Sequence, residues 1–266
     1  MTGSKMKPLC CFYLMLTIIF ILCIMGIATN PQPLAQEKHQ NQWATPLEQA
    51  AYYGDTNTVL KAIDSGYDVN TQNHDGFTLL SYAVAGNQLK IVKLLLEHGA
   101  DPRIDKGSSM VNASYSEDST MLKLLLDAGG DPNARFGFML DTPILMAVRH
   151  DNIKSLVMLL ERGADPNLAD KFGYTPLIFV VTGNSTEMTS LLIEHGADID
   201  ATDINGFTAL MYACQSGKIN NVRFLLEKGA DISIKDIYGL NAKAIAKKKG
   251  YINIVSLLEV RGHPCK

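Results

Sequence analysis

The chain has 266 residues, and its hydrophobic content of 47% excludes an intrinsically disordered protein. Residues 29–266 contain 22 lysines and arginines against 27 aspartates and glutamates, a net charge of −5, which argues against nucleic acid as a partner because phosphate backbones bind to basic surfaces. Three of the five cysteines lie in the apolar N-terminus, which leaves Cys214 and Cys265, too few for a disulfide framework and without metal-ligand spacing.

An almost uninterrupted apolar run occupies residues 9–28 and follows two lysines. A positive start, an apolar middle and small residues at the end are typical of a secretory signal peptide. About 20 residues in a helix also reach about 30 Å, enough to cross a bilayer, so an uncleaved membrane anchor is equally compatible. We expect residues 1–28 to be this signal peptide or anchor, and residues 9–28 within it to form a hydrophobic helix that does not contact the rest of the protein. The location is then exported, periplasmic or extracytoplasmic, with the protein either released or anchored to the membrane by residues 9–28.

A flexible linker is predicted for residues 29–42. Their sequence, TNPQPLAQEKHQNQ, is rich in proline and glutamine and shows no apolar period. Residues 43–266 form the remaining domain. If the apolar run stays in the membrane, a flexible linker of this length holds that domain roughly 20 Å away from the bilayer.

A repeat of about 33 residues runs through this domain. Glycines follow successive leucine-rich runs at intervals of 33, 33, 30, 34, 33 and 33 residues, at Gly66, Gly99, Gly129, Gly163, Gly196, Gly229 and Gly262. Each period repeats the same phrases, such as LLEHGAD at 95–101 and LLERGAD at 159–165, or DKFGYTPL at 170–177 and DINGFTAL at 203–210. With these phrases the chain resembles the ankyrin-repeat family over residues 44–262. The resemblance implies an all-α solenoid of about seven β-turn/helix–loop–helix units, preceded by the N-terminal hydrophobic helix.

Each recurring residue of the repeat has a physical role that its chemistry predicts. Threonine is predicted to cap the first helix of five repeats, at Thr45, Thr78, Thr142, Thr175 and Thr208, and proline follows three of these caps, where a missing N–H costs nothing. Five residues after each cap a small or apolar residue allows neighbouring helices to approach closely. Nine residues after it, glycine, asparagine or aspartate suits the left-handed conformation that ends many helices. One leucine slot recurs in the second helix, at Leu95, Leu125, Leu159, Leu192, Leu225 and Leu258, and stacking of the repeats is expected to bury it.

Two neighbouring repeats depart from the pattern. Repeat three is three residues short, and we place its cap at Ser108, which predicts a truncated turn before that residue. Repeat four has GFMLD at 137–141 where Asp-x-x-Gly-x is expected. The irregular pair is either a decayed part of the array or a gap shaped for a partner.

No pattern predicts chemistry. The chain has no nucleophile elbow, phosphate-binding glycine loop or zinc spacing, so we expect no catalytic residue, no metal site and no cofactor. His98 and His195 occupy the same slot at the end of a second helix, where a partial positive charge suits the helix dipole. Cys214 replaces a small core alanine, which predicts a buried and unreactive thiol.

The resemblance implies binding of a protein by the turns and the inner face of the first helices. Aromatic residues and arginine carry much of the energy of protein interfaces. The candidate partner-binding residues of these types on that surface are Tyr52, Tyr53, Phe77, Tyr115, Phe138, Arg149, His150, Phe172, Tyr174, Phe207 and Tyr238. If this surface binds a partner, we expect six of them to be substantially exposed, namely Tyr52, Tyr53, Tyr115, Arg149, Tyr174 and Phe207. Packing between adjacent turns is the alternative role for Phe77, Tyr174 and Phe207.

The sequence therefore predicts a monomeric, non-catalytic scaffold that holds or inhibits a protein partner in an exported compartment. Exported bacterial ankyrin proteins include helpers of enzymes in the same compartment and neutralisers of toxic effectors. The alternative is a membrane-anchored adaptor that faces the cytoplasm and uses Cys10 and Cys11 as acylation sites.

Overall fold

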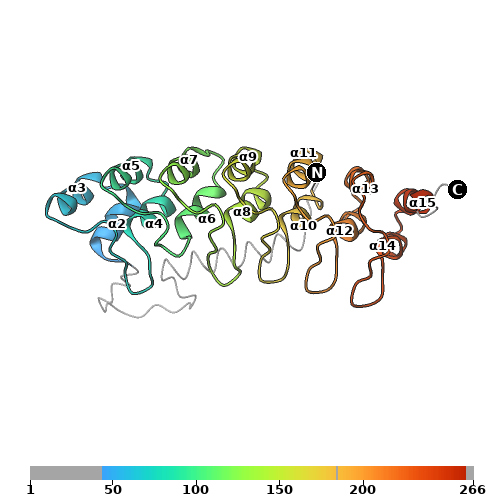
Figure 1. Ribbon diagram of the computed structural model, residues 1–266. Helices are drawn as coiled ribbons and strands as arrows, with labels where there is room; N and C mark the ends of the chain where they lie inside the picture. Colours follow the sequence, from blue (N-terminus) through green and yellow to red (C-terminus); the bar gives the residue numbers. More distant parts are fainter. Residues whose placement is uncertain (1–43, 184, 262–266) are drawn as a thin grey trace, which may run out of the picture.

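The computed structural model describes residues 44–183 and 185–261, which form one stack of helix pairs. The first helix of each pair, called the inner helix, is one of α2 (Pro46–Tyr53), α4 (Leu79–Ala85), α6 (Ser108–Ser114), α8 (Pro143–Arg149), α10 (Pro176–Val180), α12 (Ala209–Gln215) and α14 (Ala242–Lys249). The second, called the outer helix, is one of α3 (Thr56–Asp64), α5 (Leu89–Glu97), α7 (Thr120–Asp127), α9 (Ile153–Glu161), α11 (Thr186–Glu194), α13 (Ile219–Glu227) and α15 (Ile252–Arg261). Figure 1 shows the two kinds of helix in two parallel rows, with loops hanging below the inner row. The expected all-α solenoid of about seven units is confirmed for the described residues.

The inner helices begin where the sequence predicts. All five predicted threonines are N-caps whose side chains accept a backbone N–H three residues later. The small or apolar residue five positions on is buried in every case, as Ala83 and Ala213 illustrate with 0% exposure. Positive φ angles follow at four of the predicted helix ends, namely Gly54, Asn87, Asp151 and Gly217. Local signals therefore set both the start and the end of these short helices.

The outer helices supply the recurring leucine slot. Its six leucines are 0–2% exposed and pack into one continuous core with the inner helices. Six of the predicted terminal glycines have positive φ just after the outer helices end; Gly262 lies outside the described residues. Cys214 is buried in the same core as a free thiol, as expected.

Repeat three corrects one prediction. Ser108 is not the cap but the first helical residue, and the N-cap is Gly107, with φ of 81°. The carboxylate of Asp105 does the capping instead: it accepts the backbone N–H of Ser109 at 3.0 Å, together with the hydroxyl groups of Ser108 and Ser109. The short turn brings an aspartate within reach of the helix start, so a side-chain cap at Ser108 itself is not needed.

The loops between an outer helix and the next inner helix are called fingers here and are numbered by the repeat that they precede. Finger three, between α5 and α6, is shorter than the other five, as the missing residues predict. Backbone hydrogen bonds join the tips of fingers four to seven: Lys171 donates to Met139 at 2.9 Å, Ile204 to Phe172 at 3.1 Å, and Ile237 to Asn205 at 3.0 Å. The four tips therefore form one fixed edge.

Asparagine side chains join the fingers a second time, near their bases. Asn70, Asn133 and Asn167 each donate to a glycine carbonyl of the next repeat and accept the backbone N–H of an aspartate there. The sequence reasoning missed this ladder, although these asparagines recur four residues after the terminal glycines. It satisfies backbone groups that the loops would otherwise leave without partners.

The predicted signal peptide or anchor at residues 1–28, with its hydrophobic helix at 9–28, and the linker at 29–42 lie outside the described residues. Within the described part of the chain, no helix has the length and apolar character needed to cross a membrane.

Candidate functional site

Two surfaces of the stack carry the candidate binding residues. One is the inner edge, at the C-terminal ends of the inner helices, and the other is the row of finger tips. Five of the eleven candidates are exposed in the structure: Tyr53, Tyr115, Phe138, His150 and Tyr238. The other six are partly buried: Tyr52, Phe77, Arg149, Phe172, Tyr174 and Phe207. Exposure therefore divides the predicted set into surface groups and packing groups.

Arg149 belongs to the packing group, and the expectation that it is substantially exposed is wrong. Its side chain is 12% exposed, donates to the carboxylate of Asp141, and lies 2.9 Å from that of Asp170, which is fully buried. The guanidinium also lies 4.5 Å from the centroid of the Phe179 ring. Arg149 thus ties finger four to finger five, because Asp141 and Asp170 belong to those two fingers.

Tyr174 and Phe207 pack around a tyrosine that is 8% exposed, Tyr212. The ring of Tyr212 lies 5.6 Å from that of Tyr174 and 5.2 Å from that of Phe207. Its hydroxyl donates to the carboxylate of Asp203 at 2.7 Å and lies 2.9 Å from the Tyr174 hydroxyl. Burial, reinforced by these two hydrogen-bond partners, raises the pKa of Tyr212 far above its usual range. The packing alternative therefore holds for Tyr174 and Phe207.

Phe77 has the same role in fingers two and four. Its ring lies 6.2 Å from the ring of Tyr82 and 6.1 Å from that of Phe136, both in edge-on geometry. Phe136 belongs to finger four, so this contact bridges the place where finger three is short. Offset and edge-on aromatic pairs of this kind add about 0.5–1.5 kcal/mol beyond the area that they bury.

Aromatic side chains, exposed at Tyr53, Tyr115 and His150 and partly buried at Tyr52, gather on the inner edge of the first four repeats. Tyr52 and Tyr53 contact each other at 5.1 Å between ring centroids, and Tyr115 contacts His150 at 5.4 Å. Burial, and to a lesser extent the nearby Tyr52, raises the pKa of Tyr115. Burial lowers the pKa of His150, and the adjacent Arg149 guanidinium lowers it further. The edge is therefore aromatic and, at His150, biased toward the neutral ring.

Four large hydrophobic side chains are exposed at the finger tips. Phe138 is 76% exposed, Ile204 63%, Ile237 62% and Tyr238 75%. The sequence reasoning named the two aromatic residues but missed the two isoleucines, because it considered aromatic side chains and arginine. The signal was present: Ile204 and Ile237 occupy the first variable position of Asp-x-x-Gly, which the structure places at the open end of the finger.

The apolar character begins at finger four. The tip residues of fingers two and three are polar, namely His74, Asp75 and Lys106, and all three are exposed. The row of tips is therefore polar at fingers two and three and carries its exposed apolar side chains on fingers four, six and seven, with the exposed Lys171 on finger five between them. The change falls at the two irregular repeats.

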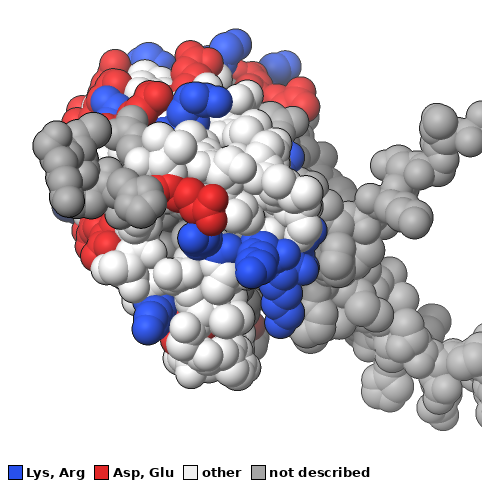
Figure 2. Space-filling view, turned by 90° about the vertical axis from the view of Figure 1, so that its right-hand side faces the viewer, with Lys and Arg blue, Asp and Glu red and all other residues white. Residues whose placement is uncertain are grey.

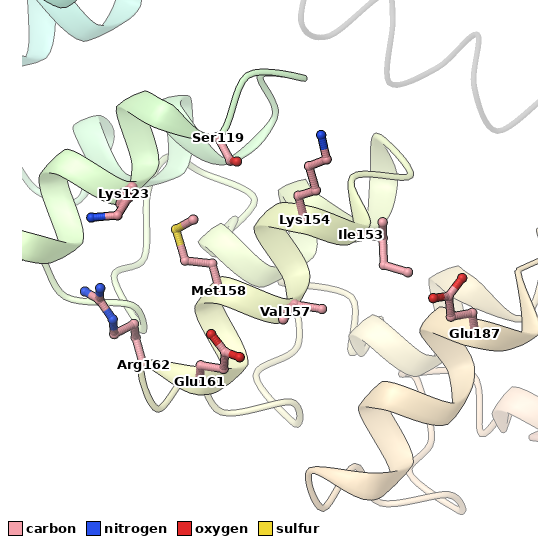
Figure 3. Close-up of a pocket in the computed structure, with 9 residues that line it drawn as sticks. All are labelled: Ser119, Lys123, Ile153, Lys154, Val157, Met158, Glu161, Arg162 and Glu187. Atoms are coloured by element: carbon pink, nitrogen blue, oxygen red, sulfur yellow. The ribbon is translucent and has the colours of Figure 1, made fainter.

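A shallow pocket lies on the opposite face, among the outer helices (Figure 3). Ile153, Val157 and Met158 of α9 form its apolar part, flanked by charged residues that include Lys123 of α7 and Glu187 of α11. The pocket thus lies where α7, α9 and α11 meet on the outer row.

Lysines mark the C-terminal end of the stack. Lys247, Lys248 and Lys249 are exposed in the last turn of α14, and lysine and arginine side chains gather at one side of the end face (Figure 2). Cations suit the C-terminal end of a helix because of its dipole. Among the described residues, no group of three or more histidines, cysteines, aspartates or glutamates could hold a metal ion.

Known proteins resemble this chain over most of the repeats. A family model described as ankyrin repeats (3 copies) matches residues 47–136 and 144–236, more than half of the chain. Protein PhlB of Serratia liquefaciens is 30% identical over 168 residues, which cover 59% of this chain and 73% of PhlB. The palmitoyltransferase ZDHHC17 of Homo sapiens is 27% identical over 143 residues, which cover 53% of this chain but only 18% of that enzyme. The crystal structure of the ankyrin repeat domain of Bcl-3 matches with a TM-score of 0.67 at 32% identity and covers 80% of this chain and 98% of the solved one.

Proposed function

Because the chain belongs to the ankyrin-repeat family, whose repeats bind protein partners, we propose that it holds or inhibits a partner protein in an exported compartment, without catalysis. The repeat array is the protein-binding scaffold. The match to ZDHHC17 covers too little of that enzyme to transfer its activity to this chain. The identity of the partner is a separate question from the surface that binds it.

The observation that carries the proposal is the row of exposed apolar finger tips. Four side chains from three fingers, those of Phe138, Ile204, Ile237 and Tyr238, are each more than 60% exposed. Exposed apolar side chains that gather on one edge of a domain often mark an interaction site. The backbone hydrogen bonds between the tips hold the backbone that carries these side chains in place before a partner arrives, which lowers the entropy lost on binding.

The test of the scaffold is affinity capture with matched variants. The full chain is immobilised and exposed to proteins of its source organism, in parallel with the double variant Phe138→Ser/Tyr238→Ser. The control is Ile252→Ser/Val260→Ser, which removes equally exposed apolar side chains from α15, away from the fingers. We expect a specific protein that the control retains and the finger variant loses by at least 10-fold. Equal retention by all three forms would refute the finger-tip surface.

The compartment is part of the proposal and rests on residues 9–28. Their apolar run suits either a cleaved signal peptide or an anchor. A reporter enzyme fused after Lys266 distinguishes an exported domain from the alternative, a membrane-anchored adaptor facing the cytoplasm. Alkaline phosphatase, which needs an oxidising compartment to form its disulfides, is active in the first case and inactive in the second.

A further inference from the structure

The short finger three leaves a notch between fingers three and four. Its buried floor consists of Pro102, Gly107 and Ala134. Its exposed rim consists of Arg103, Lys106, Asp131 and Arg135, so three cations and one carboxylate surround it. The notch lies at the point where the finger tips change from polar to apolar.

Two of the rim cations are held in place without a balancing negative charge. The ammonium group of Lys106 donates to the backbone carbonyl of Asp75 at 2.7 Å, and the guanidinium of Arg135 donates to the carbonyl of Ala169 at 3.2 Å. Neither forms an ion pair with a carboxylate of the described residues, whereas Arg103 is paired with Asp101 at 2.7 Å. Lys106 and Arg135 are therefore cations that hydrogen bonds hold in place and that no ion pair within the described residues neutralises.

The surrounding sequence makes this pair unusual. Residues 44–208 contain 11 lysines and arginines against 22 aspartates and glutamates, so this part of the chain has a net charge of −11. An acidic group approaching this part of the chain therefore meets a net negative charge. The notch is a local exception at which the approach of a negative charge is favourable.

The position of Lys106 is also costly to maintain. Its φ angle is 56°, a left-handed conformation that costs a non-glycine residue about 1–2 kcal/mol. Its side chain lies across Gly76, and a Cβ atom at that glycine would overlap the Cε of Lys106. Strained residues persist where the surroundings over-determine them and often occur at functional sites.

We propose that the notch receives an acidic side chain of the protein partner, and that apolar residues next to it in the partner lie along the finger tips. This inference rests on the proposed function and adds the chemistry of the partner segment. Phe138 follows Arg135 by three residues in finger four, and the ammonium group of Lys171 lies 3.1 Å from its ring centroid, so the first exposed apolar side chain stands on a finger that bounds the notch. Neighbouring helices pack about 8–10 Å apart, so fingers four to seven span roughly 25–30 Å, the length of about nine residues in an extended segment.

The probe for this inference is a phage-displayed library of random twelve-residue peptides, selected against the full chain. We expect the enriched peptides to share an aspartate or glutamate next to several apolar residues. A synthetic peptide of the enriched sequence should bind at least 10-fold more weakly to Lys106→Glu/Arg135→Glu, and more weakly also to Arg135→Gln, which removes charge without reversing it. The matched control, Lys90→Glu/Lys93→Glu on α5, has the same change of charge on the outer row and should bind within 2-fold of the parent.

The possible outcomes distinguish failure of the notch inference from failure of the proposed protein-binding function. Enriched peptides without an acidic residue, or unchanged affinity for both notch variants, would overturn the notch inference. If Phe138→Ser/Tyr238→Ser still abolishes binding in that case, the finger-tip scaffold stands without the notch. If no variant on either surface changes the affinity, both proposals fail. Circular dichroism of each variant distinguishes lost binding from lost folding.

Discussion

Replacing Arg149 by methionine should destabilise the fold, because its guanidinium forms ion pairs with carboxylates of two fingers, Asp141 of finger four and Asp170 of finger five. Its side chain is 12% exposed and faces the fully buried carboxylate of Asp170. Removing one partner of a buried ion pair costs about 3–5 kcal/mol, since the remaining charge is left uncompensated. Asp170 keeps the backbone N–H groups of Phe172 and Tyr174 at 2.9 and 3.0 Å, so we expect the lower end of that range, about 3 kcal/mol.

The measurement is urea unfolding followed by far-UV circular dichroism at constant protein concentration. A double-mutant cycle with Asp141→Asn isolates the pairwise term, and contacting residues of this kind typically couple by about 0.5–3 kcal/mol. The control is Arg162→Met, whose ion pair with Asp127 is exposed to solvent and should contribute less than about 1 kcal/mol.

One result would restore the reading of Arg149 as a binding residue. If Arg149→Met lowers the free energy of unfolding by less than about 1 kcal/mol, as expected of an exposed side chain, the ion pairs of Arg149 do not stabilise the fold as we infer. If that variant also weakens partner binding at least 10-fold while folded, Arg149 acts at the interface as the sequence alone suggested.

Three further predictions test other parts of the structure. Leu192→Ala, at a fully buried core position, should lower the free energy of unfolding by about 2–5 kcal/mol, whereas Leu60→Ala, at a position 37% exposed, should cost clearly less in the same urea titration. Burial, and then Arg149, lower the pKa of His150 from its usual 6.5, so the unfolded chain binds the proton more readily than the folded protein. The contribution of His150 to stability is therefore present above about pH 6.5 and is lost as the pH falls. His150→Gln should flatten the dependence of the free energy of unfolding on pH between pH 7 and pH 5. Burial raises the pKa of the Cys214 thiol to about 12, so mass spectrometry should find Cys214 unlabelled by iodoacetamide in the native protein and labelled in urea; labelling of the native protein would contradict the buried thiol.

The repeat interior could be predicted from sequence because its signals recur at a fixed period. The threonine caps, the small residue five positions later and the leucine slot each appear in several repeats, so chance similarity is averaged out. Ser108 was misplaced as a cap because repeat three is three residues short, and its turn therefore does not align with the turns of the other repeats. Its helix start depends on Asp105, a residue whose role follows only from the shortened turn.

The surface was predicted less well, because one slot of the repeat can point outward or pack against the next finger. Arg149 and Tyr115 occupy the same slot, two residues after the buried alanines Ala147 and Ala113, yet Arg149 turns inward to two carboxylates that lie 8 and 21 residues away in the sequence. Sequence spacing gives no measure of such contacts between repeats. The aromatic search likewise passed over Ile204, whose exposure follows from its place at a finger tip and not from its residue type.

The structure favours a shaped gap over decay as the origin of the irregular repeat three. A decaying repeat should lose its interior packing, yet Met110 and Leu125 are fully buried. Gly130 stands where four other repeats have an alanine after the terminal glycine, and a Cβ atom there would overlap the sulfur of Met110, so the glycine leaves room for that side chain. The hydroxyl of Ser114 is likewise buried but donates to the Met110 carbonyl at 2.7 Å. Repeat three is therefore short in its finger, where the shortening opens the notch, while its core stays packed.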